Sequence, residues 1–512
     1  MSLIPIYVVG GYLLILLVLG VVCSRFFRGT STDFFVASRS IGPFVLLMSV
    51  FGTTMTAFAL VGSTGRSYAS GIGTYGLMAS WSGLIHSAVF FLVGIKLWAV
   101  GKRYGYVTQC QYFRDRFESP GIGYVLFPIL VILVIPYLLI GVLGSGAVVA
   151  AISKGMFPQI FADGGGAVPA WLTGAVVCMV VLIYVFLSGV RGAAWANTFQ
   201  TLVFMFTGLV AFVLIANALG GLSAASEAVR VNAPTKLARE GEIGRVQFMS
   251  YCFIPLSVGM FPHLFQNWLT ARSAKTFRLT VAVHPLFIMI VWVPCVLIGI
   301  WAAGIPLGLP VEKQNAVLGV VVQRLLSNPW LTGLLTAGIL AAIMSSLDSQ
   351  FMCIGTMFTN DIVTHLAGED QLTDRQKLWI GRTFVVGIVA VTYVLSLLGT
   401  RHIFMLAVWC FSGFSALFPA VFAAVYWRRA TRLGVYSAII VTAIVWLAFF
   451  HASGYGGEYL LLTDQLDGDG LMPVAVMFAA CAVTLVVVSL LTSPPSSQTL
   501  ARFFSDPPTP TL

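Results

Sequence analysis

The chain has 512 residues, of which 58% are hydrophobic and only 9% are charged. An ordinary soluble domain carries roughly 25% charged residues, so this composition excludes a water-soluble fold. Apolar stretches recur along the whole chain. With about 20 residues each, they are long enough to cross the roughly 30 Å hydrocarbon core of a bilayer. The composition therefore predicts an all-α polytopic membrane protein that has the lipid bilayer as its surroundings.

Hydropathy along the chain predicts about 13 transmembrane helices. The first lacks the basic segment and the small-residue cleavage site of a secretory signal, so we expect a permanent helix there. The expected spans are 5–25, 43–65, 73–100, 123–153, 168–188, 192–219, 247–271, 276–303, 329–360, 378–400, 402–427, 433–452 and 471–492.

Basic residues are unevenly distributed over the loops between these spans. One set of loops, with Lys96 at a helix end, holds 19 of the 28 lysines and arginines, and the opposite set holds nine, four of them in one long loop. Loops rich in lysine and arginine stay on the cytoplasmic side. We therefore expect a multi-pass protein of the cell membrane (plasma or inner) with its N-terminus outside and its C-terminus in the cytoplasm.

The same asymmetry accounts for the net charge of +10. Nucleic-acid binding would need the basic residues clustered on one soluble module, and the sequence contains no such module. No obligatory protein partner is evident. The six histidines are scattered. Neither a His-Glu-x-x-His pair nor a Gly-x-Ser-x-Gly elbow is present, so we do not expect an enzyme.

Two of the expected spans contain helix-breaking residues at mid-depth. The span 43–65 has Gly52 in a stretch rich in serine and threonine, and the span 247–271 has Pro255, Gly259 and Pro262. Such residues free backbone carbonyls that lipid cannot satisfy, so the two segments should line a cavity or an ion site. Each begins a run of five spans, a placement typical of transporters with inverted repeats. Two kinks that only assist helix packing are the alternative.

The span 329–360 carries a face of small and hydroxyl-bearing residues. Ala342, Ser345, Ser346 and Ser349 are three or four positions apart and share that face. Hydroxyl and carbonyl oxygens suit a small hard cation. Asp348 adds a carboxylate inside the span, which is by default a functional-site hypothesis. We predict an ion site here; the alternative is a serine-rich seam that lets two helices approach closely.

Residues 49–71, 188–200 and 341–349 carry a resemblance to a known family, and the order of spans agrees with it over about 43–452. These segments resemble the sodium:solute symporter family, which includes proline, pantothenate, sodium–glucose and sialic acid carriers. The resemblance implies a LeuT-type five-plus-five inverted repeat with an extra N-terminal helix. It also implies secondary active transport, by alternating access, of a small solute coupled to sodium.

The implied organisation has six parts. They are an extra N-terminal helix and cytoplasmic loop (1–42), the first inverted repeat (43–219), an extracellular loop (220–246), the second inverted repeat (247–428), two additional helices (429–492) and a cytoplasmic tail (493–512). The tail is rich in serine, threonine and proline, which predicts disorder.

The resemblance also implies ligands for the coupling ion, sodium. The principal site maps to the backbone carbonyls of Gly52, Met55 and Ala342 and the hydroxyls of Ser345 and Ser346. A second cation site maps to Asn197, Asp348 and Ser349. Many members have an acidic residue at the position of Asn197 and a serine at that of Asp348. In this chain the carboxylate therefore stands on the neighbouring helix, and local charge is unchanged.

Mid-depth aromatic and polar residues are candidates for the solute site, because aromatic walls with a few convergent polar groups suit a small molecule. The candidates are Thr53, Thr56, Trp81, His86, Tyr137, Tyr251, His263, Gln266, Trp409 and Phe414. Single aromatic residues at such depths also serve as packing or interfacial anchors. Arg66, near the outer end of a broken span, is either a partner for an anionic solute or an ordinary loop arginine.

The nature of the solute rests on finer comparisons within the family. The pattern around Pro262 and His263 is similar to that of the pantothenate carrier, which favours a small organic carboxylate. Thr54 stands where the proline carrier has an acidic residue, and Ile254 and Val258 stand where it has aromatic ones, which argues against proline. A sodium- or solute-gated channel or sensor on the same fold is the alternative function.

Overall fold

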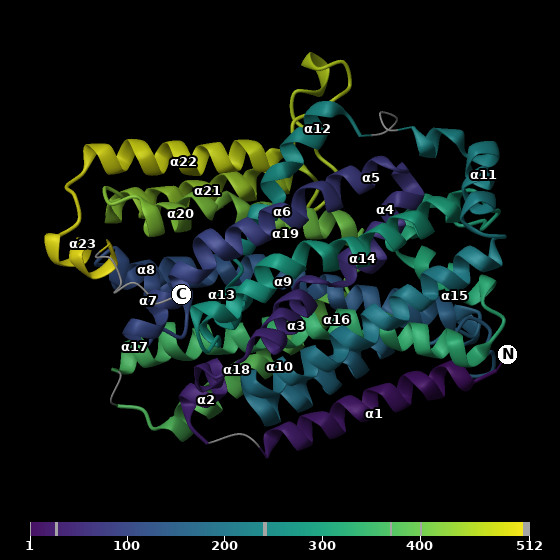
Figure 1. Cartoon of the computed structure of the whole chain (residues 1–512), viewed down its shortest axis with the longest axis horizontal. Coiled ribbons are helices and arrows are strands. Elements are labelled where there is room, and N and C mark those ends of the chain that lie inside the picture. Colours follow the sequence, from purple (N-terminus) through teal and green to yellow (C-terminus); the bar gives the residue numbers. More distant parts are fainter. Residues whose placement is uncertain (1, 26–28, 239–242, 369–370, 400–401, 505–512) are drawn as a thin grey trace.

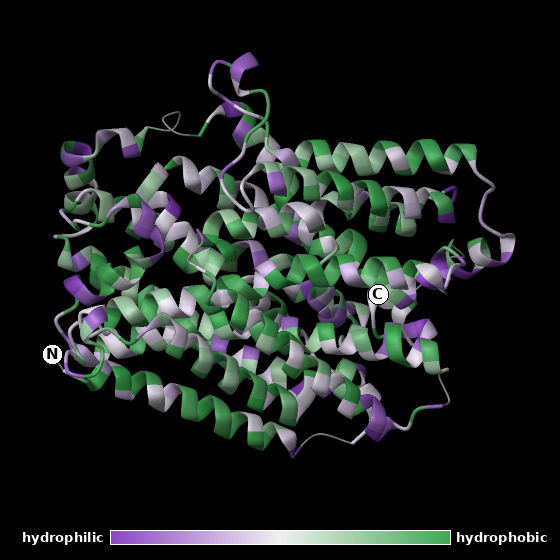
Figure 2. Cartoon of the chain, turned by 180° about the vertical axis from the view of Figure 1, so that it is seen from behind, coloured by the Kyte–Doolittle hydropathy of each residue, from purple (hydrophilic) through white to green (hydrophobic). Residues whose placement is uncertain are grey.

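The computed structural model describes residues 2–25, 29–238, 243–368, 371–399 and 402–504. Within these residues the backbone forms helices joined by turns and contains no strand, apart from two isolated bridges. In Figure 1 most long helices run along the horizontal axis, with α1 (Ile4–Ser24) along one edge and α21 and α22 side by side along the other. Figure 2 shows hydrophobic residues along these helices and hydrophilic ones gathered mainly at both ends of the bundle.

Ten helices among the described residues are long and apolar enough to cross a membrane. Besides α1 they are Gly73–Tyr104 (α5 to α7), α9 (Gly121–Ile152), α10 (Ala170–Ala218), Ala274–Ala303 (η8 and α14), Pro329–Ala367 (α16, η10 and α17), α18 (Asp374–Ser396), Ile403–Tyr426 (α19 and α20), α21 (Arg432–Ala452) and α22 (Pro473–Leu491). Within the composite helices the main segments are α6 (Trp81–Val89), α7 (Ile95–Tyr104), α14 (Phe277–Ala303), α16 (Pro329–Met357), η10 (Phe358–Val363), α19 (Ile403–Ala416) and α20 (Phe418–Tyr426).

Two further spans are bent at short breaks, where the sequence predicted interruptions. The first joins α3 (Pro43–Thr54) to η2 (Phe58–Gly62) and α4 (Ser63–Ser70) with a bend of 54°. The second joins α12 (Arg245–Ser250) and η7 (Tyr251–Gly259) to α13 (Pro262–Leu269) with a bend of 47°. The shorter connecting helices are α2 (Ser31–Val36), α8 (Gln109–Arg116), α11 (Leu222–Asn232), α15 (Val317–Leu325) and α23 (Ser497–Phe504).

The helix α10 is 49 residues long and contains a break at Gly189, where φ is 62° and ψ is −162°. A side chain disfavours this backbone conformation, so glycine suits the position. About 20 residues suffice for one span, so α10 is long enough for two. With α10 counted as two spans, the ten helices of the described residues give eleven spans. The two bent pairs bring the number to thirteen, as predicted from hydropathy.

The centre of the bundle is formed by α16, which packs against α10, α9 and α3. Of the most apolar window of Pro329–Ala367, 83% is buried, against 28% for α1. Even so, α1 lies close to α10: a Cβ atom added to Gly20 would be 2.4 Å from the Cβ of Tyr184. Real Cβ atoms do not approach so closely, so glycine permits this contact.

The tail differs from the prediction of disorder over 493–512. Residues 497–504 form α23, at the left of Figure 1, and residues 505–512 lie outside the described residues. The Nη2 atom of Arg502 lies 2.5 Å from Asp115 Oδ2 and 3.1 Å from the hydroxyl oxygen of Tyr106. Composition alone did not reveal that an arginine and two phenylalanines in this segment have partners on α7 and α8.

Candidate functional site

The break after α3 brings backbone carbonyls next to α16. The hydroxyl oxygen of Ser345 lies 2.7 Å from the carbonyl oxygen of Gly52 and 3.1 Å from that of Ala342. Met55 follows the last residue of α3 with φ −88° and ψ 94°, so its backbone is extended there. Three of the five predicted sodium ligands, Gly52, Ala342 and Ser345, therefore lie together. A fourth, Met55, directly follows α3.

A close contact between α3 and α10 also shapes this region. A Cβ atom on Gly52 would lie 2.3 Å from the hydroxyl oxygen of Thr201, which donates a hydrogen bond to the Met48 carbonyl at 3.1 Å. Glycine at position 52 therefore allows the two helices to touch. The fifth predicted ligand, Ser346, donates to the Ile343 carbonyl of its own helix at 2.9 Å. These groups are neutral oxygens, which suit a monovalent hard cation.

The buried carboxylate of Asp348 lies at the junction of α16 and both halves of α10. The Tyr184 hydroxyl donates to Oδ2 at 2.9 Å, and the Ser349 hydroxyl oxygen lies 3.1 Å from Oδ1. The hydrogen-bond network favours an Asn197 amide with its nitrogen 3.0 Å from Oδ2 of Asp348 and its oxygen accepting from Ser349. The three residues of the predicted second cation site thus converge.

The two predicted ion sites are adjacent. In the favoured orientation, the nitrogen of Asn197 is also 2.9 Å from the backbone carbonyl oxygen of Ser345. The Thr53 hydroxyl, predicted to contact solute, lies 2.8 Å from that of Ser349. Thr53 therefore belongs to the polar cluster around Asp348. Because Thr53 directly follows Gly52 in the chain, it links this cluster to the principal site predicted for sodium.

Three of the solute candidates meet in one aromatic cluster. The ring of His263 stacks on Phe261 with centroids 5.0 Å apart and lies 5.5 Å from the ring of Tyr137. Phe414 makes an edge contact with Phe261 at 5.0 Å. His263 is only 1% exposed, and within the described part of the chain neither of its ring nitrogens has a hydrogen-bond partner. Buried polar groups are nearly always paired, so such a histidine suits a ligand.

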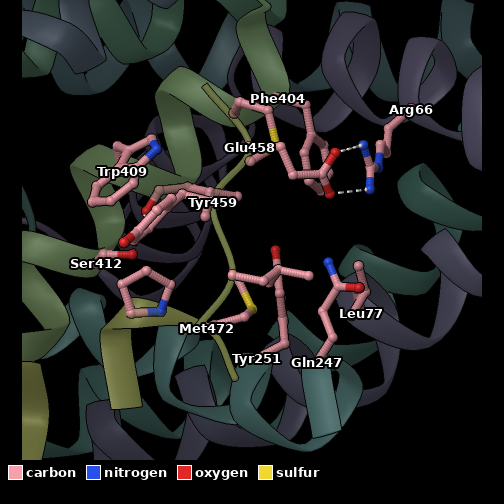
Figure 3. Close-up of a pocket in the computed structure, with 14 residues that line it drawn as sticks. Arg66, Leu77, Gln247, Tyr251, Phe404, Trp409, Ser412, Glu458, Tyr459 and Met472 are labelled. Atoms are coloured by element: carbon pink, nitrogen blue, oxygen red, sulfur yellow. Dashed lines mark hydrogen bonds and ion pairs between the residues drawn. The ribbon is translucent and has the colours of Figure 1, made fainter. Parts of the chain in front are cut away.

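Two other candidates, Tyr251 and Trp409, line a cavity between η7 and α19 (Figure 3). The cavity also has Phe404, Ser412 and Tyr459 in its wall. Arg66 and Glu458 face each other at one end of the view, joined by two hydrogen bonds. An aromatic wall with a few polar groups fits a small organic molecule.

The remaining solute candidates have polar atoms engaged elsewhere. Trp81 donates to the Phe248 carbonyl at 3.2 Å, His86 contacts His284 at 3.2 Å, and Gln266 donates to the Phe35 carbonyl at 2.7 Å. The Thr56 hydroxyl accepts from the backbone of Phe58 at 3.0 Å, which begins the second half of the broken span. The first three contacts join separate helical segments, the contact of Thr56 is local, and none of them brings the four residues into the aromatic cluster.

Sequence reasoning missed several residues that complete these clusters. Tyr184, which binds Asp348, is the one tyrosine of the span 168–188, and that signal was available. Phe261 adjoins the Pro262 break. The ring of Phe411 lies 5.0 Å from that of Tyr137 and 5.5 Å from that of Phe261, and Phe411 stands between Trp409 and Phe414 in the sequence. No local sequence pattern marks Glu458, because its partner Arg66 is 392 positions away.

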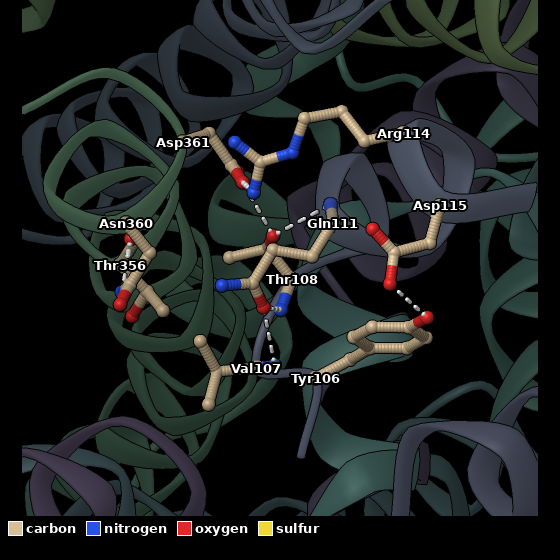
Figure 4. Close-up of polar contacts among 9 residues, drawn as sticks. All are labelled: Tyr106, Val107, Thr108, Gln111, Arg114, Asp115, Thr356, Asn360 and Asp361. Carbon is tan, nitrogen blue, oxygen red and sulfur yellow. Dashed lines mark hydrogen bonds and ion pairs between the residues drawn. The ribbon is translucent and has the colours of Figure 1, made fainter. Parts of the chain in front are cut away.

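A second buried carboxylate, Asp361, was also missed. Its Oδ1 accepts a hydrogen bond from the Thr108 hydroxyl at 2.7 Å and lies 3.8 Å from an Arg114 nitrogen (Figure 4). Thr108 is the N-cap of α8, and Gln111 completes its capping box. The contacts tie α8 to η10, which continues α16. Asp115 in α8, and Tyr106 just before that helix, are the partners of Arg502 in α23.

The two bent spans at the heads of two helical runs, packed around the central helix α16, define a LeuT-type transporter fold. The family model described as "Sodium:solute symporter family" matches residues 34–442. The chain therefore belongs to the sodium:solute symporter family and is a multi-pass membrane protein. Membership supports sodium-coupled symport of a small-molecule solute, with sodium as the coupling ion, and points to a transporter, not an enzyme.

Curated relatives are similar over nearly their whole length. The chain is 26% identical to the sodium/proline symporter of Escherichia coli (strain K12) over 495 residues, which cover 92% of this chain and 90% of the relative. It is 23% identical to the sodium/proline symporter of Haemophilus influenzae over 512 residues, covering 96% and 95% of the two chains.

Solved structures agree on the fold. A substrate-bound, outward-open sodium-coupled sialic acid symporter matches with a TM-score of 0.76 at 16% identity, covering 97% of this chain and 99% of that one. Mhp1, a nucleobase-cation-symport-1 family transporter in a closed conformation, matches with a TM-score of 0.54 at 12% identity, covering 91% and 97%. At these identities the likeness concerns the fold alone.

Proposed function

We propose that the protein couples sodium entry to the inward transport of a small organic carboxylate, with the ion bound between α3 and α16. The observation that carries this proposal is the Ser345 hydroxyl, which lies within 3.1 Å of the carbonyl oxygens of both Gly52 and Ala342. A sodium ion in this position would replace hydrogen bonds of that hydroxyl with ion–oxygen contacts. Met55 and Ser346 would complete the set of oxygen ligands.

A second cation is proposed at Asp348, with Ser349 and Asn197 as neighbours. The carboxylate would offset the charge of an ion, whereas the principal site has only neutral ligands. The alternative is a purely structural role, in which the Asn197 amide and the Tyr184 hydroxyl satisfy the carboxylate by hydrogen bonding. Both readings involve the same contacts, so only substitution separates them.

The proposed solute chamber lies between η7, α13 and α19. Its support is the buried His263 with its aromatic neighbours and the cavity that contains Tyr251 and Trp409. A solute with one charged end and an apolar body would match such a wall. The curated relatives are named for proline, itself a small carboxylate, although Thr54, Ile254 and Val258 argue against it. Proline therefore belongs in the panel of solutes to be tested.

The deciding experiment is uptake by proteoliposomes of labelled carboxylates, amino acids, sugars and nucleobases, with and without a sodium gradient. We expect a carboxylate to accumulate above its equilibrium level only when the gradient is present. Ser345→Ala and Ser346→Ala should each raise the sodium concentration needed for half-maximal uptake, because each removes an oxygen ligand. Thr336→Val is the matched control, since the Thr336 hydroxyl donates within α16 to the Thr332 carbonyl at 2.6 Å.

Two outcomes would contradict the proposal. Wild-type sodium activation in both serine variants would put the ion elsewhere. A solute- or sodium-gated current without uphill accumulation would favour the channel alternative, because a channel cannot concentrate its solute.

A further inference from the structure

A narrow cavity and a wider hollow meet at one ion pair. Trp409 and Tyr251 line the cavity, and Lys236, Glu312 and Asp469 line the hollow, which is the larger of the two spaces. Residues that line both spaces are Arg66, Gln247, Met405, Glu458 and Leu460. Arg66 and Glu458 thus stand where the hollow leads into the proposed solute chamber.

The pair has the geometry of guanidinium–carboxylate recognition. Nη1 of Arg66 lies 3.0 Å from Oε2 of Glu458, and Nη2 lies 2.7 Å from Oε1, so the two planar groups are joined by two parallel hydrogen bonds (Figure 3). This fork is the arrangement in which arginine binds any carboxylate. Glu458 therefore occupies a site that a carboxylate from solution would also fit.

The two partners differ in how firmly they are held. Arg66 belongs to α4 in the bundle and its side chain is 10% exposed, whereas Glu458 lies in the loop after α21 and its side chain is 44% exposed. The Nε atom of Arg66 is buried and, among the described residues, has no hydrogen-bond partner. A buried donor without a partner is costly, so the guanidinium retains capacity for a second acceptor.

The charges around Glu458 keep its carboxylate ionised. Burial alone would raise the pKa of Glu458, but the hydrogen bonds and charge of Arg66, with Gln247 and His402 nearby, hold that pKa below its usual value. The other charged groups of the wider hollow are Lys236, Glu312 and Asp469. At neutral pH the site therefore contains an internal anion on Arg66.

We propose that Arg66 is the first binding site for the carboxylate of the solute, and that Glu458 holds this site in the absence of solute as an internal competitor. Binding of the solute to Arg66 displaces Glu458 and joins the hollow to the chamber. An intramolecular carboxylate competes at an effective concentration of about millimolar or higher, so the solute binds weakly at this stage. The inference rests on the proposed transport of a carboxylate, but its test needs neither transport nor sodium.

The test uses trifluoroacetate as the probe, observed by fluorine NMR line broadening on the purified full-length protein in sodium-free buffer, with trifluoroethanol as the uncharged control. We expect Glu458→Gln and Glu458→Ala to bind trifluoroacetate about tenfold more tightly than the wild type, because the competent fraction rises when the competitor is lost. Arg66→Gln should abolish this binding. Trifluoroethanol should respond to neither change.

Glu227→Gln is the matched control, because Glu227 forms an exposed ion pair with Arg230 outside both spaces. It should leave trifluoroacetate binding unchanged. Equal or weaker binding in both Glu458 variants, each with the melting temperature of the wild type, would overturn the proposal, as would full binding by Arg66→Gln. If the expected trifluoroacetate binding is found but the protein shows no sodium-coupled uptake of a carboxylate, the proposed function alone is contradicted.

A second readout follows the route into the chamber. Ser412 lines the narrow cavity and not the wider hollow. In the variant Ser412→Cys, a water-soluble thiol reagent should react faster when Glu458→Gln is added, with the protein lacking Ser412→Cys as the background. An unchanged rate would contradict a role of the pair in closing this route.

Discussion

The hydroxyl of Tyr184 in α10 donates a hydrogen bond of 2.9 Å to Oδ2 of Asp348 in α16. The carboxylate thereby has a fixed position next to Asn197 and Ser349. A carboxylate at mid-membrane costs roughly 2.5–3.5 kcal/mol on insertion scales. Its presence calls for a reason, and binding a cation is the reason that substitution can test.

Exchanging the two side chains tests the carboxylate of Asp348. We expect Asp348→Asn to reduce sodium-driven uptake, because the negative charge is lost from the pocket. The double variant with Asn197→Asp should recover part of it, because the charge returns from the neighbouring helix. Uptake across a sodium series at two pH values measures this and also reveals proton binding. Full sodium coupling in Asp348→Asn would leave the carboxylate a purely structural role.

Replacing His263 tests the aromatic cluster as part of the solute chamber. His263→Phe keeps a ring against Phe261 and Tyr137 but removes both nitrogens. If a solute group pairs with them, the apparent affinity should fall by about tenfold, the effect of losing roughly 1–3 kcal/mol of hydrogen bonding. His86→Phe is the control and should lower the melting temperature without changing affinity, since His86 contacts His284. Unchanged affinity in His263→Phe would remove this residue from the chamber.

The distribution of basic residues predicts the orientation. A cysteine introduced at Lys275 should react with a membrane-impermeant reagent only in inside-out vesicles, and one at Asp464 only on intact cells. The native protein supplies the background, because seven of its eight cysteines are buried and Cys252 is half-buried. Labelling of the Lys275 position on intact cells would reverse the orientation.

The carboxylate of Asp469 stabilises the start of α12. It accepts hydrogen bonds from the backbone nitrogens of Val246 at 2.7 Å and Gln247 at 3.2 Å. Burial would raise the pKa of Asp469, but these backbone donors hold the pKa below its ordinary 3.8. Asp469→Ala should therefore cost about 1 kcal/mol, as other helix-cap losses do.

The pH dependence of that effect follows from the lowered pKa. The stabilisation is fully present above the ordinary value and is lost as the pH falls through the lower folded value. Melting curves of the wild type and Asp469→Ala should therefore differ at pH 7 and converge in strong acid. Asp464→Ala, at an exposed position of the same loop, is the control. A difference that persists unchanged in strong acid would mean that the charge is not involved.

Hydropathy and helix-breaking residues sufficed to predict the spans and both bends, because these features depend on residues close in the chain. Helical periodicity placed Ala342 and Ser345 on one face, and their meeting with Gly52 agreed with the resemblance. The solute candidates were harder to predict. Gln266 had no visible partner in the sequence, since the Phe35 carbonyl that it binds is 231 positions away.

Composition was also a poor guide to side chains that act in pairs. In the sequence Arg66 was either an ordinary loop arginine or a partner for an anion, and only the fold revealed Glu458 opposite it. The disorder expected for the tail missed α23 for the same reason. Long-range pairs of charged residues leave no local pattern, whereas breaks and spans do.

The close contact between Gly20 and Tyr184 makes the first helix part of the machinery. A transporter shortened to its two repeats would lose the surface of α1 against which Tyr184 packs. Tyr184, which donates its hydroxyl hydrogen to Asp348, would then be less firmly positioned. Even one extra methyl group at Gly20 would push that tyrosine. The first helix, α1, thus helps to position the buried carboxylate of Asp348 through Tyr184, so an engineered minimal version of this protein has to retain α1.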